Sequence, residues 1–142
     1  MSAAAVAQTE TRVMEHTPDY INRRIRREME ARVFYYAQNP ERIEDRLAEL
    51  DAEWDIERAL EANAASISAL CAMMALKGQR RCLLVGLGVA GFLLQHAIQG
   101  WCPPVSIFRR IGLRTAREVN HERYALKVLR GDFSGIDLEG ED

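Results

Sequence analysis

Residues 82–108 constrain the fold more than any other part of the sequence, because these 27 residues contain no Asp, Glu, Lys or Arg. The first 20 of them, 82–101, would rise about 30 Å as an α-helix, which matches the hydrocarbon thickness of a bilayer. Trp101 would then lie at the level of the lipid headgroups, and Pro103-Pro104 would end the helix there. We therefore predict that this stretch crosses a membrane.

A second charge-free stretch, residues 62–76, precedes the first and is joined to it by the short polar turn at 77–81. As a helix it would rise only about 22 Å, so flanking residues or neighbouring helices would have to complete the span. Residues 62–110 are therefore predicted to form a two-helix membrane hairpin. Small residues favour close packing of such helices, and the candidate packing positions are Ser68, Ala72, Gly86 and Ala90.

Polar and aromatic residues of the second span have predicted roles of their own. Gln95 and His96 would face the other helix or a second copy of the chain, because lipid offers them no hydrogen bonds. Trp101, Arg109 and Arg110 would anchor the end of the span at the membrane interface.

Basic residues set the predicted orientation in the membrane. The turn carries three of them, and the stretch after the second span carries Arg109, Arg110, Arg114 and Arg117. The positive-inside rule then predicts a protein of the bacterial inner membrane with both termini in the cytoplasm. The first 20 residues lack the basic start and apolar core of a secretory signal, which agrees with this orientation.

The segments before the hairpin predict amphipathic helices. Residues 1–16 show no periodicity and are expected to be a disordered arm. Thr17-Pro18 and Asn39-Pro40 are typical helix starts, so residues 17–61 are expected to form cytoplasmic amphipathic helices. The second of these has a narrow apolar seam that requires a partner helix, formed by Ile43, Leu47, Leu50 and Trp54.

One more polar helix is predicted after the hairpin, within residues 111–131. Thr115 and Glu118 form a capping box that opens this helix, and Gly131 closes it. Residues 132–142 are acidic and are expected to be a disordered tail.

Charge is distributed unevenly along the chain, although the net charge is only −2. Residues 41–61 carry a net charge of −6, and residues 62–130 carry +8. Such asymmetry suits basic flanks that face anionic lipid, or halves that attract each other in a dimer. The overall balance is not that of a nucleic-acid-binding protein, so we predict no nucleic-acid partner. The three cysteines indicate neither a disulfide framework nor a metal site, and we predict no cofactor.

A glycine motif inside the apolar stretch favours a different function. Gly86, Gly88 and Gly91 fit the GxGxxG pattern, in which glycines let the backbone approach a pyrophosphate at a helix N-terminus. Arg109 and Arg110 follow a second candidate strand and could hold a 2′-phosphate. An NADP-binding fragment is therefore an alternative, although the chain lacks the further β-rich stretches that a parallel sheet needs. The other alternative is a soluble helical interaction module with both apolar stretches in its core.

The second half of the chain resembles a known family. Gly100-Trp101-Cys102-Pro103-Pro104, followed by Ile111-Gly112-Leu113-Arg114-Thr115, is similar to the signature of a small two-helix membrane-domain family. That family occurs alone and as the membrane anchor of YgaP-like rhodanese sulfurtransferases. The resemblance covers roughly residues 55–116 and implies a membrane anchor with a link to sulfur metabolism. Many members carry a second Cys where this chain has Ala116, and no rhodanese domain precedes the hairpin.

Cys102 is the candidate catalytic residue that this resemblance points to. A thiol at the membrane surface could accept a persulfide or act in redox chemistry if Arg109 or Arg110 lowered its pKa. The structural alternative, which we favour, is that Cys102-Pro103 ends a helix.

These patterns together predict an all-α protein: an amphipathic helical hairpin, then a two-helix transmembrane hairpin, then a short polar helix. We expect a membrane anchor or partner-binding subunit that is not an enzyme by itself. Two spans of limited length leave much surface uncovered, so a homo-oligomer or a larger membrane complex is expected within the lipid bilayer.

Overall fold

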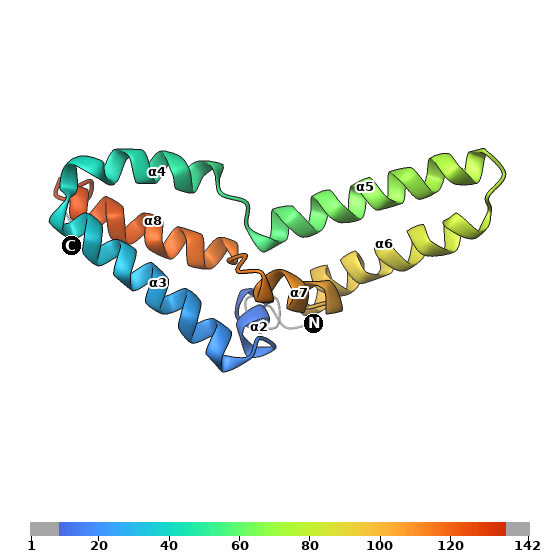
Figure 1. Ribbon diagram of the computed structural model, residues 1–142, viewed down its shortest axis with the longest axis horizontal. Coiled ribbons are helices and arrows are strands. Elements are labelled where there is room, and N and C mark those ends of the chain that lie inside the picture. The colour runs from blue at the N-terminus through green and yellow to red at the C-terminus, as the bar shows by residue number, and fades with distance from the viewer. Residues whose placement is uncertain (1–8, 136–142) are drawn as a thin grey trace, which may run out of the picture.

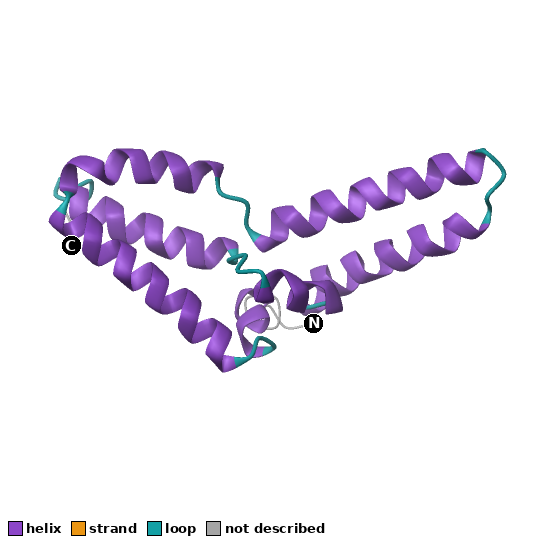
Figure 2. Ribbon diagram, viewed as in Figure 1, coloured by secondary structure: helices purple, strands orange, loops and turns teal. Residues whose placement is uncertain are grey.

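The computed structural model describes residues 9–135, and every regular element in that range is helical. A long hairpin of two helices extends from a head that the other helices form (Figure 1). Figure 2 shows the described chain as helices and connecting loops, without strands. The predicted all-α class is therefore confirmed for the described residues.

The hairpin consists of α5 (Ile56–Leu76) and α6 (Arg81–Gln99). Helix α5 begins well before residue 62 because Asp55 caps it, its carboxylate accepting a hydrogen bond of 2.7 Å from the backbone N–H of Arg58. With 21 residues, α5 is about 31 Å long, so the helix is longer than the charge-free stretch 62–76 from which it was predicted. At the tip, Gly78 takes a positive φ of 97°, which reverses the chain without steric cost.

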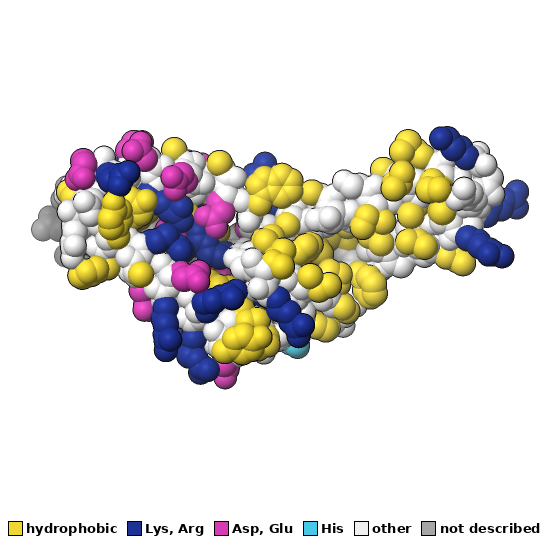
Figure 3. Space-filling view, in the orientation of Figure 1, with side chains coloured by type: hydrophobic (Ala, Val, Ile, Leu, Met, Phe, Trp, Pro, Cys, Tyr) yellow, Lys and Arg dark blue, Asp and Glu magenta, His cyan; other side chains and the backbone are white. Residues whose placement is uncertain are grey.

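Most large apolar side chains of the hairpin are exposed. No residue of α6 is buried. Figure 3 shows hydrophobic side chains along the hairpin and basic side chains at its tip. Two helical stretches of the described chain are long and apolar enough to cross a membrane, Arg81–Gln99 and Pro40–Leu76, and the apolar part of the second is α5.

The head is a bundle of α3 (Asp19–Gln38), α4 (Ile43–Ala52) and α8 (Ala116–Arg130), with a short 3-10 turn, η1 (Pro40–Arg42), between α3 and α4. Its core contains Ile43, Leu47 and Leu50 of α4, packed against Val119 and Leu126 of α8. The partner of the predicted seam is therefore α8, and the expected amphipathic hairpin is part of a three-helix bundle. Trp54 falls outside the seam, because the chain is extended after α4; it is 52% exposed, with the Arg58 guanidinium 4.9 Å from its ring centroid.

Helix ends follow the predicted signals at η1 and α8. They do not at the end of the second apolar stretch, where Gly100 ends α6 and Pro103-Pro104 begin α7 instead of ending a helix. The capping box of Thr115 and Glu118 is present at the start of α8, and Gly131 ends that helix with a positive φ of 88°. Pro40 occupies the first turn of η1. Thr17 differs from its predicted role as an N-cap, because its hydroxyl donates back to the carbonyl of Val13 at 2.5 Å.

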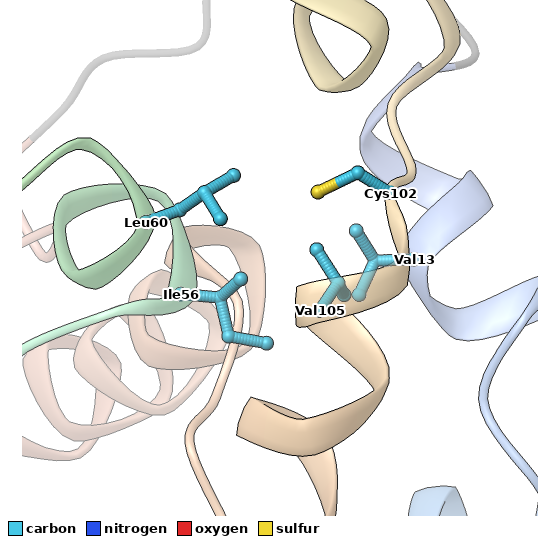
Figure 4. Close-up of a cluster of buried hydrophobic side chains, with 5 residues drawn as sticks. All are labelled: Val13, Ile56, Leu60, Cys102 and Val105. Carbon is cyan, nitrogen blue, oxygen red and sulfur yellow. The ribbon is translucent and has the colours of Figure 1, made fainter. Parts of the chain in front are cut away.

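Helices α2 (Thr9–Glu15) and α7 (Pro103–Arg110) lie where the hairpin joins the head (Figure 1). Helix α2 falls in the segment predicted as a disordered arm; it is ordered because Val13 is buried against the residues that start α5 and α7. Figure 4 shows this second core, which Val13, Ile56, Leu60, Cys102 and Val105 form. Residues 1–8 of the predicted arm and 136–142 of the predicted tail lie outside the described residues.

Candidate functional site

A network of charged side chains occupies the centre of the head. Glu122 of α8 is fully buried and accepts hydrogen bonds from Arg32 of α3 at 3.0 and 3.1 Å and from Arg46 of α4 at 2.9 Å. A third guanidinium, that of Arg114, donates to the same carboxylate. Burial alone would raise the pKa of Glu122, but the three guanidinium donors lower it from 4.5 to about 2. Glu122 is therefore ionised at neutral pH and joins three segments of the head.

Acidic neighbours balance the charge of this network. Glu53 accepts from the Nη2 of Arg114 at 2.5 Å and lies 3.7 Å from Arg46, which also pairs with the exposed Glu49. Three guanidinium groups thus meet three carboxylates, which leaves no uncompensated charge to attract a substrate. The network is a structural crosslink rather than a catalytic site.

Arg109 has a different role from the predicted membrane anchor. Its side chain is fully buried and donates to Glu118 at 2.5 and 3.0 Å, to the Oδ1 of Asn22 at 2.7 Å and to the hydroxyl of Thr17 at 3.2 Å. The prediction for Arg109 is wrong because this face of α7 packs against the head. Arg110, the next residue, is exposed.

Cys102 lies in the second core rather than at a surface. Its side chain is fully buried among Val13, Ile56 and Val105, and burial raises the pKa of its thiol. The condition for a reactive thiolate, a pKa lowered by Arg109 or Arg110, is therefore not met. Cys102 therefore packs in a core. The favoured alternative, that Cys102-Pro103 ends a helix, is wrong, because Cys102 is the N-cap of α7 and Pro103 is the first residue of that helix.

The glycine motif lies inside a continuous helix. Gly86, Gly88 and Gly91 are interior residues of α6, so the strand and turn of a dinucleotide site are not formed. A Cβ added at Gly86 would come within 3.3 Å of the Cβ of Cys71, whereas no described atom lies within 4 Å of the corresponding positions at Gly88 and Gly91. Gly86 therefore allows α5 and α6 to approach each other, and the alternative of a nucleotide site at this glycine motif is wrong because the motif is helical throughout.

The other predicted packing residues divide into two groups. Ser68 is half-buried in the hairpin, like Gly86, whereas Ala72 and Ala90 are exposed. Gln95 and His96 are half-buried; the Gln95 amide donates to the Oε1 of Gln99 at 3.4 Å.

Trp101 lies at the base of the hairpin, as predicted, but packs against the protein. Its ring stacks on His16, with the ring centroids 5.2 Å apart. The side chain is half-buried, so this stacking covers part of the ring within the protein. Nearby, the Arg12 guanidinium lies 3.5 Å from the carbonyl of Gln99, which links α2 to the end of α6.

One groove in the head was not predicted. It has a volume of about 840 Å³ and lies between α3 and α8, and Met14 of α2 also contributes to its lining. Its apolar lining consists of Ile25, Met29, Val33, Phe34, Ala37 and Ala125, and its charged lining of Arg26, Glu30, Arg117 and Glu118. The sequence signal was present as the stripe on α3 that includes Ile25, Met29 and Val33, which the arginine residues flank. This groove is the candidate functional site for binding another molecule.

Comparison with known proteins adds no family to this description. No protein-family model, curated protein or solved structure matches the chain. Within residues 9–135, no group of three or more His, Cys, Asp and Glu side chains could hold a metal ion. The similarity to the YgaP-like membrane domain stays a prediction.

Proposed function

We propose that this chain is a bacterial inner-membrane protein in which α5 and α6 span the bilayer and hold the helical head in the cytoplasm as a partner-binding module. The observation that carries the proposal is α6, where 18 consecutive residues after Arg81 carry no formal charge and none is buried. A helix this apolar and this uncovered needs an apolar surrounding, and lipid supplies it.

The exposed large apolar side chains of the hairpin favour a bilayer over water. Eleven of them are at least 41% exposed: Ile67, Leu70, Met73, Leu76, Leu83, Leu84, Val85, Leu87, Phe92, Leu94 and Ile98. Burying one such side chain is worth about 1.5–3 kcal/mol, so contact with water would cost more than about 10 kcal/mol in total. A soluble chain of this size has little stability from which to offset such a cost.

Both ends of the hairpin suit a bilayer. Helix α6 has 19 residues and a length of about 28 Å, close to the hydrocarbon thickness. At the tip, Lys77, Arg80 and Arg81 are exposed, where their long side chains can reach headgroups on the far side. Ala72 and Ala90 are exposed on the spans, and there a second copy could approach closely.

The link to sulfur chemistry that the family resemblance implies has less support. It requires Cys102 to meet a sulfur donor, but this thiol is fully buried and its pKa is raised. We therefore propose the anchor role without a reaction at Cys102.

Membrane extraction and thiol labelling test this proposal. The chain should stay in the pellet through an alkaline carbonate wash and dissolve only in detergent. In a Cys82→Ser background, whose other cysteines are buried, Gln79→Cys should react with an impermeant maleimide in intact cells, and Tyr124→Cys only after permeabilisation. A chain that washes free as a soluble monomer would refute the bilayer assignment, and the reverse labelling pattern would refute the orientation.

A further inference from the structure

The groove between α3 and α8 has the composition of a protein-binding surface. Met29, Val33 and Ala37 lie along one side, and Phe34 is 67% exposed at its edge. Met, Phe and Arg are enriched at interfaces, and Met adapts its shape to different partners. An apolar groove in a polar head is unfavourable in water, which indicates that another molecule covers it.

The charges along the groove are not all used within the protein. Glu118 is bound to Arg109 and to the backbone N–H of Thr115. Arg26 and Arg117, on opposite walls, are exposed and form no ion pair with any described residue. Glu30 is the remaining carboxylate of the lining, and the exposed Arg23 and Arg27 add positive charge along α3. The groove is therefore apolar inside and positive at its rim.

The dimensions of the groove suit a helix. Its lining on α3 runs from Asn22 to Ala37, which is about 22 Å of helix or four turns. A helix lying in a groove of this length presents apolar residues at positions i, i+4, i+7 and i+11.

We propose that this groove binds an amphipathic helix of another protein, with its apolar face on Met29 and Val33 and with Asp or Glu residues beside Arg26 and Arg117. This proposal names the chemistry of the partner for the function proposed above. It rests on that function only for the location of the head in the cytoplasm. Opposite charges at the rim attract the acidic helix and repel a basic one, which gives specificity.

Two matched peptides test the proposal on the full chain in nanodiscs of zwitterionic lipid. Both are 16 residues long with the same leucine face; one carries Glu and the other Lys on the flanks. Fluorescence anisotropy should give the Glu peptide a Kd at least tenfold lower than the Lys peptide, with no binding to empty nanodiscs. If the chain is soluble instead, the same titration is made without lipid. The test of peptide binding therefore does not depend on the membrane assignment.

Single substitutions locate the binding. Arg26→Glu and Arg117→Glu should each weaken binding of the Glu peptide about threefold or more, because an attraction becomes a repulsion, and Phe34→Asp should abolish it. Arg58→Glu is the matched charge control outside the groove and should leave binding unchanged; circular dichroism confirms that each variant folds. Equal affinity for both peptides, or equal weakening by Arg58→Glu, overturns the proposal. A third outcome also overturns the proposal: the wild type forms a dimer and binds neither peptide, and Phe34→Asp abolishes the dimer. The groove would then be an interface between copies of the chain.

Discussion

Replacing Glu122 by Gln should destabilise the head by about 3 kcal/mol. Glu122 is fully buried under Arg32, Arg46 and Arg114, and the substitution leaves three guanidinium groups without their shared anion. A carboxyl pKa lowered from 4.5 to about 2 corresponds to about 3 kcal/mol of stability at neutral pH. Removal of one partner from a buried ion pair costs about 3–5 kcal/mol in other proteins, which agrees with this value.

The assay is urea unfolding of the chain in detergent, monitored by far-UV circular dichroism and by the combined fluorescence of Trp54 and Trp101. Glu49→Gln is the matched control, since Glu49 also accepts from Arg46 but is 62% exposed as a side chain. Exposed ion pairs contribute about 0–1 kcal/mol, so this control should change the free energy of unfolding by less than about 1 kcal/mol. If the two variants were equally stable, Glu122 would not hold the head together and the reasoning would fail.

The same carboxylate predicts the response to acid. Because its pKa is lower in the folded state, its contribution to stability is complete above about pH 4.5 and is lost as the pH falls through about 2. The urea midpoint of the wild type should therefore decrease over this interval, and that of Glu122→Gln should decrease less. A steeper acid loss in the variant would contradict the assigned pKa.

Two further predictions concern the hairpin and the buried thiol. Gly86→Leu should lower the stability of the hairpin in a proteolysis or thermal assay, because the leucine side chain would collide with Cys71. Gly88→Leu is the control and should have little effect. Equal effects of the two substitutions would show that α5 and α6 do not approach closely at Gly86. In the folded protein, Cys102 should react with a small maleimide at least about tenfold more slowly than the partly exposed Cys82, because Cys102 is buried and its pKa is raised. A faster reaction at Cys102 would support a catalytic role for this thiol.

Local sequence signals predicted the helices because their causes are local. The capping box at Thr115 and Glu118 and the Gly131 end are satisfied within one helix, so nothing distant could overrule them. The start of α5 was placed too late, because the prediction used the absence of charge and not the cap at Asp55. The groove between α3 and α8 depends on contacts between distant segments, which a local sequence pattern does not predict. The apolar stripe on α3 is visible in the sequence, but the groove exists only because α3 packs against α8, about 90 residues later in the chain, and the stripe does not identify that neighbour.

Arg109 and Arg110 show why such contacts decide a residue's role. Successive residues on a helix point about 100° apart, so two adjacent arginines cannot both face the same surface. From the sequence they were equivalent candidates for lipid anchoring. In the structure, the positions of Asn22 and Glu118 select Arg109 for burial and leave Arg110 outside.

The uneven charge along the chain has a cause within the single chain. The acidic segment 41–61 pairs with the basic segment 62–130 through Glu53 with Arg114, Glu44 with Arg130 and Asp51 with Arg123. These pairs join α4 and Glu53 to α8 and to Arg114 just before it, so opposite charges meet between segments of the head, whereas the sequence had suggested lipid or a dimer.

Hydrogen bonds beside these ion pairs fix the hairpin to the head. The backbone N–H of Ile56, the first residue of α5, donates to the carbonyl of Arg114 at 2.9 Å, and the N–H of Ala116 donates to Glu57 at 3.0 Å. The start of α5 is thus bonded to the start of α8, the helix that forms one wall of the groove. Because Arg114 is itself held by Glu122, the groove keeps a fixed direction relative to the hairpin. A partner helix bound there would therefore be held at a defined orientation to the bilayer that we propose.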